Sequence, residues 1–412
     1  MKKFLFRNGI YTVLRPLYYL CKLFGLASYS YVADRRNKRV TTDYGYLNYM
    51  FTVIWLIVYT AVLPVHILYD YSVDIVPQTI FIVFILYVIF SYTSTIIVVV
   101  WVSFIKRKRF LEIIEKVSEV DNKIQYTVQE ETYMNRKVMF NIISEIILLT
   151  ASQCTVNIYS IYIFKSESYY IIILILTDVF ATYICNILFL FQYLNLVFMM
   201  KQRYSHLNKR LNNWISGTVS RPIYLNKENE RNIQSNVAVG LVNITPLCVS
   251  TVGNIEGTLM QTDIHLLRQI YSELYDITCL INDTYGIPIL ASICWILTTV
   301  VCCLYEVLFE FNVWGVTDII CAITCSALVF KVTLFCHTAT NEARSSNILV
   351  QKLLLFGNCR NECVKELKMF SFQLQVLKNE YTACGFFSLN LRLFTTVVSL
   401  IMSYIIIMLQ IK

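Results

Sequence analysis

Apolar residues dominate seven stretches of the chain, and most charged residues lie in the segments between them. A helix of about 20 mostly apolar residues is long enough to cross the hydrocarbon core of a bilayer. The pattern therefore predicts an all-α, polytopic membrane protein with seven transmembrane helices. We place these helices at residues 47–68, 79–105, 138–164, 170–200, 288–309, 316–336 and 393–411.

Helical spacing of apolar residues also continues outside these spans. It runs past the fourth span to Trp214, resumes at about Asp263 before the fifth span, and recurs in residues 361–380. The polar segment 217–258 lacks this spacing, so we expect a mobile loop there. Residues 1–46 are predicted to form a cytosolic or interfacial N-terminal segment, and residues 47–200 to hold transmembrane helices one to four. Residues 201–287 form cytosolic helical extensions with the mobile loop, and residues 288–336 hold transmembrane helices five and six. Residues 337–392 form further cytosolic helices, and residues 393–412 hold the seventh transmembrane helix.

Composition and charge agree with a membrane protein and suggest its orientation. Of the 412 residues, 57% are hydrophobic and 15% are charged, whereas soluble domains are about 45–50% apolar and about 25% charged. Lys and Arg gather in alternate connecting segments, and the other segments hold only Lys165 and the terminal Lys412. Because basic loops stay in the cytoplasm, we expect a cytoplasmic N-terminus and an extracellular C-terminus. The net charge of +8 then requires no nucleic acid, although it favours contact with anionic membrane lipid.

Sequence motifs of catalysis, cofactor binding and metal binding are missing. No Gly-x-Gly and no His-Glu-x-x-His occurs, and the four histidines are far apart in the chain. Cys359 and Cys363 form a pair without a second pair nearby, which is a poor match to a structural zinc site. We therefore expect no enzymatic activity, no cofactor and no metal ion.

Polar side chains inside predicted spans are candidates for function because burying them in hydrocarbon is costly. Three acids and six aromatic residues share roughly the outer depth of the predicted membrane, and together they could hold a small polar ligand; they are Asp178, Glu306, Asp318, Tyr159, Tyr162, Tyr183, Trp295, Tyr305 and Trp314. The alternative is an aromatic belt at the membrane interface with structural polar groups. Glu145 and Lys331 lie nearer the inside, where we expect a structural ion pair or snorkelling.

The last span carries polar residues on one helix face. Ser403, Ile406 or Ile407, and Gln410 recur every three or four residues. A glutamine among Ile, Met and Leu needs a polar partner, which pore water or the same residue of a symmetry mate would supply. Such a hydrophobic constriction beside a polar ring can gate a channel. Snorkelling of Gln410 to the outer interface is the alternative.

Three further motifs precede this one: Asn282-Asp283-Thr284-Tyr285-Gly286, Cys336-His337 with Asn341-Glu342-Ala343, and Tyr381-Thr382-Ala383-Cys384-Gly385-Phe386-Phe387. With the Ser403-Tyr404 and Gln410 pattern and the inverted seven-helix topology, they resemble the insect gustatory receptors. The motifs cover roughly the C-terminal third of the chain. The family pattern has Thr, Phe and Phe where this chain has Ser403, Ile411 and Tyr285, which leaves the packing of the gate open.

The resemblance implies a ligand-gated, nonselective cation channel in the plasma membrane, built as a homotetramer or as a heterotetramer with related subunits. Residues 337–392 would anchor the subunits to one another, and the last helix of each subunit would line a central pore. Gln410 would then line the gate and Tyr404 would pack the pore helix, beside the pore-face candidates Ser403, Ile406 and Ile407. The first expectation for the ligand is a bitter or other plant-derived small-molecule tastant. A sugar-gated channel and an odorant receptor are the alternatives within this group.

Two more distant alternatives are a G-protein-coupled receptor and a secondary transporter. The receptor class has the opposite orientation and an Asn-Pro-x-x-Tyr motif, yet no Asn-Pro occurs in this chain. Transporters usually show repeated halves and helices broken by Gly or Pro in the membrane. Here the sixth and seventh predicted spans contain no Pro, and no repeat is evident.

Overall fold

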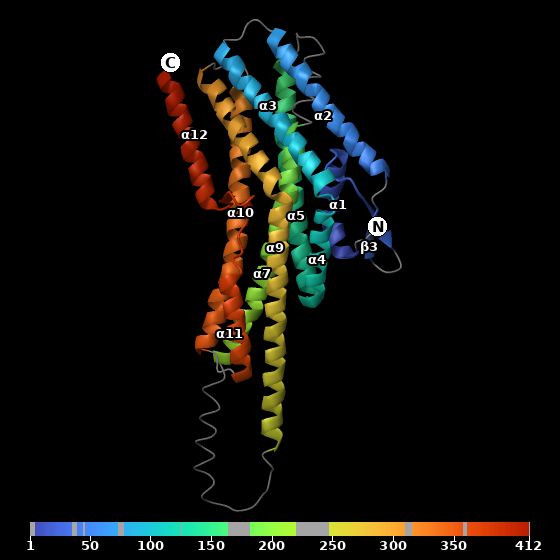
Figure 1. The fold of residues 1–412 in the computed structure, drawn as a ribbon, viewed down its shortest axis with the longest axis vertical. Coiled ribbons are helices and arrows are strands. Elements are labelled where there is room, and N and C mark those ends of the chain that lie inside the picture. Colours follow the sequence, from blue (N-terminus) through green and yellow to red (C-terminus); the bar gives the residue numbers. More distant parts are fainter. Residues whose placement is uncertain are drawn as a thin grey trace, which may run out of the picture. The chain divides into compact units, whose positions relative to one another are not determined.

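The computed structural model describes residues 5–34, 39–43, 46–72, 78–124, 126–163, 182–219, 247–309, 315–356 and 361–411. The fold is mostly helical, and the chain divides into two compact units (Figure 1). Unit 1 comprises Met1–Met199, Ile277–His337 and Glu380–Lys412, and unit 2 comprises Met200–Asp276 and Thr338–Asn379. Each unit is described by itself below.

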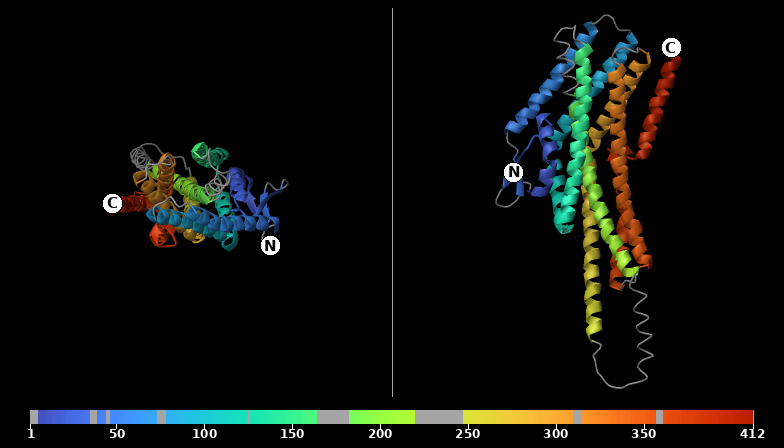
Figure 2. Two further views of the ribbon diagram at one scale, coloured as in Figure 1. Left: turned by 90° about the horizontal axis from the view of Figure 1, so that it is seen from above. Right: turned by 180° about the vertical axis from the view of Figure 1, so that it is seen from behind.

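The long helices of the chain coincide with the predicted spans. They are α2 (Tyr46–Ser72), α3 (Gln78–Val100) with the π-helical turn η1 (Trp101–Ile105), α5 (Val128–Ile163), α7 (Ile184–Val219), α9 (Leu247–Phe309), α10 (Gly315–Phe356) and α12 (Leu391–Ile411). Helices α2 and α3 lie side by side (Figures 1 and 2). Each predicted span is helical over its described residues, and the helices continue well beyond several of the predicted ends.

Among the described residues, four helical segments are long and apolar enough to cross a membrane. They are Ile85–Ile105, Ile184–Ser216, Thr262–Leu308 and Gly315–Leu355. Tyr46–Ala61 and Leu391–Ile407 are shorter apolar helices. The full count of seven spans and the inverted orientation therefore stay predictions.

Two small sheets in unit 1 were not expected from an all-α prediction. Near the N-terminus, β1 (Leu5–Arg7), β3 (Arg39–Asp43) and β2 (Ser30–Asp34) pair antiparallel in that order around the helix α1 (Asn8–Leu23). Near the C-terminus, β4 (Thr382–Ala383) and β5 (Phe387–Ser388) form a hairpin directly before α12. Another helix, α4 (Arg109–Ile124), follows η1 and buries one apolar face.

Unit 2 is built from the adjoining parts of α7, α9 and α10 together with α11 (Asn361–Val376). The Tyr271 ring lies edge-on to Tyr204 and Phe370, with ring centroids 5.7 and 5.9 Å away. Asn208 joins α7 to α10 by donating to the Glu342 carbonyl at 2.7 Å. These contacts give unit 2 its own core.

Two boundary predictions in this region differ from the structure. Helix α9 begins at Leu247 and not at about Asp263 as predicted. The last residues of the predicted mobile loop 217–258 are therefore helical. The first residues of that segment, 217–219, also belong to α7. Residues 220–246 lie outside the described part of the chain. Helix α11 ends at Val376, a few residues before the predicted end at 380.

Candidate functional site

The motif residue Asn282 fastens the β4–β5 hairpin to α9. Its side-chain amide donates to the Glu380 carbonyl at 2.7 Å, and its carbonyl oxygen accepts from the Thr382 backbone N–H at 3.2 Å. The amide thus satisfies two backbone groups of the segment that enters β4. Since the hairpin leads directly into α12, Asn282 helps to hold the segment that precedes the last helix.

Gly286, one turn further along α9, lies against the tip of this hairpin. A Cβ at Gly286 would stand 2.9 Å from the backbone nitrogen of Cys384, a distance at which the hairpin would have to shift. The tip itself turns through positive φ values at Cys384 (52°) and Gly385 (75°), a region that favours glycine. Close approach therefore favours glycine at 286, and backbone conformation favours it at 385.

The same part of α9 is also fastened to η1. Pro288 has no N–H, so the Thr284 carbonyl four residues earlier loses its usual helical partner. The Trp101 indole N–H donates to that carbonyl at 2.9 Å, which restores the missing bond from a neighbouring element. Lys106 adds an ion pair with Asp283 at 2.7 Å.

The aromatic residue of this motif, Tyr285, fills the space between α9 and α7. It is buried, and its ring centroid lies 5.7 Å from Phe189 and 5.6 Å from Tyr193. The Tyr193 hydroxyl lies 3.2 Å from the Sγ of Cys336 on α10. Tyr381, which begins the hairpin motif, is buried as well, and this burial raises the pKa of its phenol well above the usual value.

Three of the sequence motifs therefore meet in unit 1 at the base of α12. We call this place the α9–hairpin junction and define it by Asn282, Tyr285, Gly286, Cys336 and Tyr381. The remaining motif segment, Asn341-Glu342-Ala343, belongs to unit 2, where Glu342 accepts hydrogen bonds from Asn208. The resemblance supplied the motifs but not the physical role of each residue. In the sequence, Pro288 inside a predicted helix indicates that a backbone carbonyl needs another donor, and the structure shows this donor to be Trp101.

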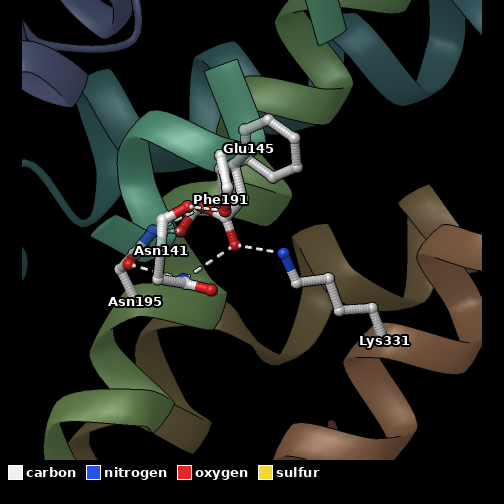
Figure 3. A network of polar contacts seen from close by, with 6 residues as sticks. Asn141, Glu145, Phe191, Asn195 and Lys331 are labelled. Atoms are coloured by element: carbon white, nitrogen blue, oxygen red, sulfur yellow. Dashed lines mark hydrogen bonds and ion pairs between the residues drawn. The ribbon is translucent and has the colours of Figure 1, made fainter. Parts of the chain in front are cut away.

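A second polar cluster links α5, α7 and α10 (Figure 3). The Lys331 ammonium lies 2.8 Å from Oε1 of Glu145, whose side chain is only 1% exposed. Asn141 donates to the same oxygen at 3.0 Å, and Asn195 donates to Oε2 at 2.8 Å. The Lys331 ammonium also lies near the Phe191 ring, 5.9 Å from its centroid. Of the two alternatives for Glu145 and Lys331, the structure shows the ion pair.

The structure brings some of the predicted ligand-binding residues together and not others. Tyr183 and Trp295 are both buried and meet edge to face with centroids 5.4 Å apart. The Trp295 indole N–H has no hydrogen-bond partner among the described residues. The half-buried Asp318 carboxyl on α10 interacts with Glu306 on α9.

The other candidates lie on α9, on α5 or outside the described residues. Tyr305 is half-buried on α9. Asp178 and Trp314 lie outside the described residues, and for Tyr159 and Tyr162 only the position on α5 is described. No group of three or more His, Cys, Asp or Glu side chains within the described ranges is placed to hold a metal ion.

Helix α12 has one buried face and one exposed face. Phe394 meets Phe330 of α10 edge to face at 5.2 Å, and Val397 and Ile401 are buried on the same side. The opposite side carries the predicted pore-face residues, all of which are exposed in the single chain: Ser403, Ile406, Ile407 and Gln410. Tyr404, expected to pack the pore helix, is 49% exposed.

These features define a multi-pass helical membrane protein whose last helix is fastened at its base and exposes a mixed polar and apolar face. A family model described as the 7tm chemosensory receptor matches residues 14–412, and the chain belongs to this family.

Comparison with solved structures supports the fold. The insect olfactory receptor OR5 from Machilis hrabei, in complex with eugenol, is 9% identical with a TM-score of 0.67, covering 98% of this chain and 100% of that one. Another structure of OR5 from Machilis hrabei is 10% identical, also with a TM-score of 0.67, at 98% and 99% coverage. None of the curated proteins that were compared matches the chain.

Proposed function

We propose that the chain is a subunit of a tastant-gated, nonselective cation channel in the plasma membrane, with its N-terminus in the cytoplasm. The channel is a homotetramer or a heterotetramer with related subunits, and it acts by conducting ions rather than by catalysis. Its ligand is a bitter or other plant-derived compound. A sugar is the alternative within the same role, and odorant reception is the nearest different role, since the solved relative binds eugenol.

The observation that carries this proposal is the exposed face of α12. Gln410 lies exposed near the end of a mostly apolar helix, and an amide facing hydrocarbon without a partner would cost free energy. Water in a pore shared by several copies of α12 would hydrate it. Ile406 and Ile407, one turn earlier, would narrow that pore to an apolar constriction.

The ligand site of this proposal lies around Tyr183 and Trp295 of unit 1. The two rings offer an aromatic wall, and the unpartnered Trp295 indole N–H offers a donor to an acceptor atom of the ligand. Helix α9 runs from Trp295 to Asn282 at the α9–hairpin junction. A ligand that binds the open state more tightly would shift the population toward it, and α9 would transmit the change to the base of α12.

Recording of tastant-evoked currents from the Gln410→Ala variant tests the pore. We expect altered gating or permeation at unchanged surface expression. Val398→Ala is the matched control, because Val398 is exposed on α12 but lies away from the face of Gln410. Currents that match the wild type in the Gln410 variant would remove this residue from the gate. A panel of bitter compounds, sugars and volatile odorants would separate the three ligand classes.

Epitope tags at the two termini test the topology. Staining of the N-terminal tag only after permeabilisation, with an accessible C-terminal tag, supports the inverted channel. The reverse pattern would exclude it and would favour G-protein coupling.

A further inference from the structure

We propose that unit 1 binds a small alcohol in a cavity between helices α1, α4 and α7. We call it the α1–α7 cavity and define it by five of the residues that line it: Leu17, Cys21, Phe110, Gln192 and Leu196. The inference goes beyond the proposed channel and does not depend on it.

The helical walls of the cavity are mostly apolar. On α1, the lining residues Leu14, Leu17 and Cys21 follow one another at spacings of three and four residues, so they share one helix face. On α7, Gln192 and Leu196 share a face for the same reason. All five side chains are buried. A small apolar molecule would therefore gain dispersion contacts from two helices.

Aromatic rings complete the lining. The Tyr29 ring stacks on Tyr18 and on Phe110, with ring centroids 5.6 and 6.1 Å apart. The Tyr18 hydroxyl donates to the Tyr29 carbonyl at 2.8 Å. A phenol carries a single proton, so this nearby hydroxyl spends its proton on the backbone and leaves Gln192 to find another donor.

Gln192 gives the cavity a chemical preference. The residue is only 5% exposed, and its Oε1 has no hydrogen-bond partner among the described residues. Burying an amide oxygen without a donor costs free energy, and a ligand hydroxyl would supply that donor. An alcohol combines such a hydroxyl with an apolar part that suits the leucine and aromatic walls.

The size of the cavity limits the ligand to a short chain. The centre of a water-sized sphere can occupy about 20 Å³ of it. Adding the radius of that sphere, about 1.4 Å, on all sides gives room of roughly 100 Å³, which suits an alcohol of about three or four carbons. Pockets for drug-sized ligands start at about 300 Å³.

The α1–α7 cavity is distinct from the ligand site that we propose around Tyr183 and Trp295. Gln192 follows Tyr183 by roughly two and a half helical turns, and neither α1 nor α4 contributes a residue to that other site. A molecule bound only by the folded chain stabilises it, so an alcohol in this cavity would strengthen the packing of α1 and α4 on α7.

Photolabelling of the purified full chain in neutral detergent tests the proposal. The probe is a butanol derivative that carries a photoreactive diazirine, and mass spectrometry locates its adducts. We expect saturable adducts on residues that line the cavity, such as Tyr18 and Cys21. Excess 2-propanol should compete with the probe. Acetone is nearly the same size but donates no hydrogen bond, so it should compete roughly fivefold more weakly, the effect of one hydrogen bond.

The variant Gln192→Leu removes the acceptor and keeps a buried side chain of similar size. Adduct formation at a subsaturating probe concentration should fall roughly fivefold. The matched control is Gln351→Leu, because Gln351 is exposed on α10 in unit 2, and it should be labelled like the wild type. Unchanged labelling of Gln192→Leu, or an equal fall in the control, would overturn the proposal.

If Gln192→Leu does not fold, competition on the wild-type chain decides. Stronger competition by 2-propanol than by acetone supports the proposal. Equal competition by the two compounds would contradict it, as would the lack of any saturable adduct in the cavity, which would mean that the cavity holds water only.

Discussion

Replacing Lys331 by methionine tests how the polar cluster in Figure 3 is stabilised. Removing one partner of a buried ion pair costs about 3–5 kcal/mol, because the other charge stays buried without compensation. Two features lower this figure here. The Lys331 side chain is 26% exposed, and Glu145 keeps the amide donors of Asn141 and Asn195, each worth about 0.6 kcal/mol in a membrane protein. We therefore expect Lys331→Met to lower the free energy of unfolding by about 2–3 kcal/mol.

Replacing the acid of the pair instead should lower the free energy of unfolding by less. In Glu145→Gln the glutamine still accepts hydrogen bonds from the neighbouring amides, and the partly exposed Lys331 can extend toward water. We expect a loss of about 1 kcal/mol for this variant. The double variant leaves no buried charge in the cluster, so it should be about as stable as Glu145→Gln alone. The coupling free energy between the two positions is then about 2–3 kcal/mol.

Unfolding of the detergent-solubilised chain, followed by circular dichroism as denaturing detergent is added, measures these differences. Lys352→Met is the control, since Lys352 is exposed on α10 and its loss should change stability by less than about 0.5 kcal/mol. Additive effects of the two single substitutions, with coupling below about 0.5 kcal/mol, would refute the reasoning and would make the ion pair energetically unimportant.

The remaining predictions concern the base of α12. Gly286→Ala should lower stability by about 1–3 kcal/mol because its Cβ would press on the hairpin backbone, whereas Gly315→Ala, with open space around it, should leave the melting temperature nearly unchanged; equal shifts would contradict the close approach. Asn282→Ala removes two hydrogen bonds to the hairpin, at about 1–3 kcal/mol, and hydrogen exchange of the hairpin amides should accelerate; unchanged protection would show that other contacts suffice. Phe330→Ala and Phe394→Ala should be non-additive by about 0.5–1.5 kcal/mol in a double-mutant cycle, and strict additivity would mean that the rings do not interact.

Sequence reasoning succeeded where a single periodicity or a strong energetic rule applies. Long apolar stretches predicted the positions of α2, α3, α5 and α12, because a helix makes all of its backbone hydrogen bonds within the segment when it is buried in an apolar environment. The cost of isolated charges in spans also pointed to Glu145 and Lys331 as partners. The amide pair that completes their network is not evident from sequence, since Asn141 and Asn195 are far apart in the chain and meet only when α5 packs on α7.

Other features depend on tertiary packing and were missed. The residues after Leu247 include Gly253 and Gly257, which lower helix propensity, yet α9 includes them, because propensity is a weak guide once a helix is part of a larger element. The hairpin strands have two residues each, too few to show an alternating pattern. The edge-to-face contact between Trp295 and Tyr183 was also missed, although both residues were predicted, from their depth, to line a ligand site. This contact depends on how α9 is rotated, which depth does not reveal.

The contacts along α12 divide this helix into two parts with different requirements. Its base is held by the α9–hairpin junction and by Phe394, and burial continues as far as Ile401. Beyond that residue, the described side chains are half-buried or exposed, up to and including Gln410. A segment that is rich in isoleucine and carries an exposed amide at Gln410 is stabilised best by apolar neighbours on one side and water on the other. In the channel that we propose, copies of the same helix around an aqueous axis would provide both.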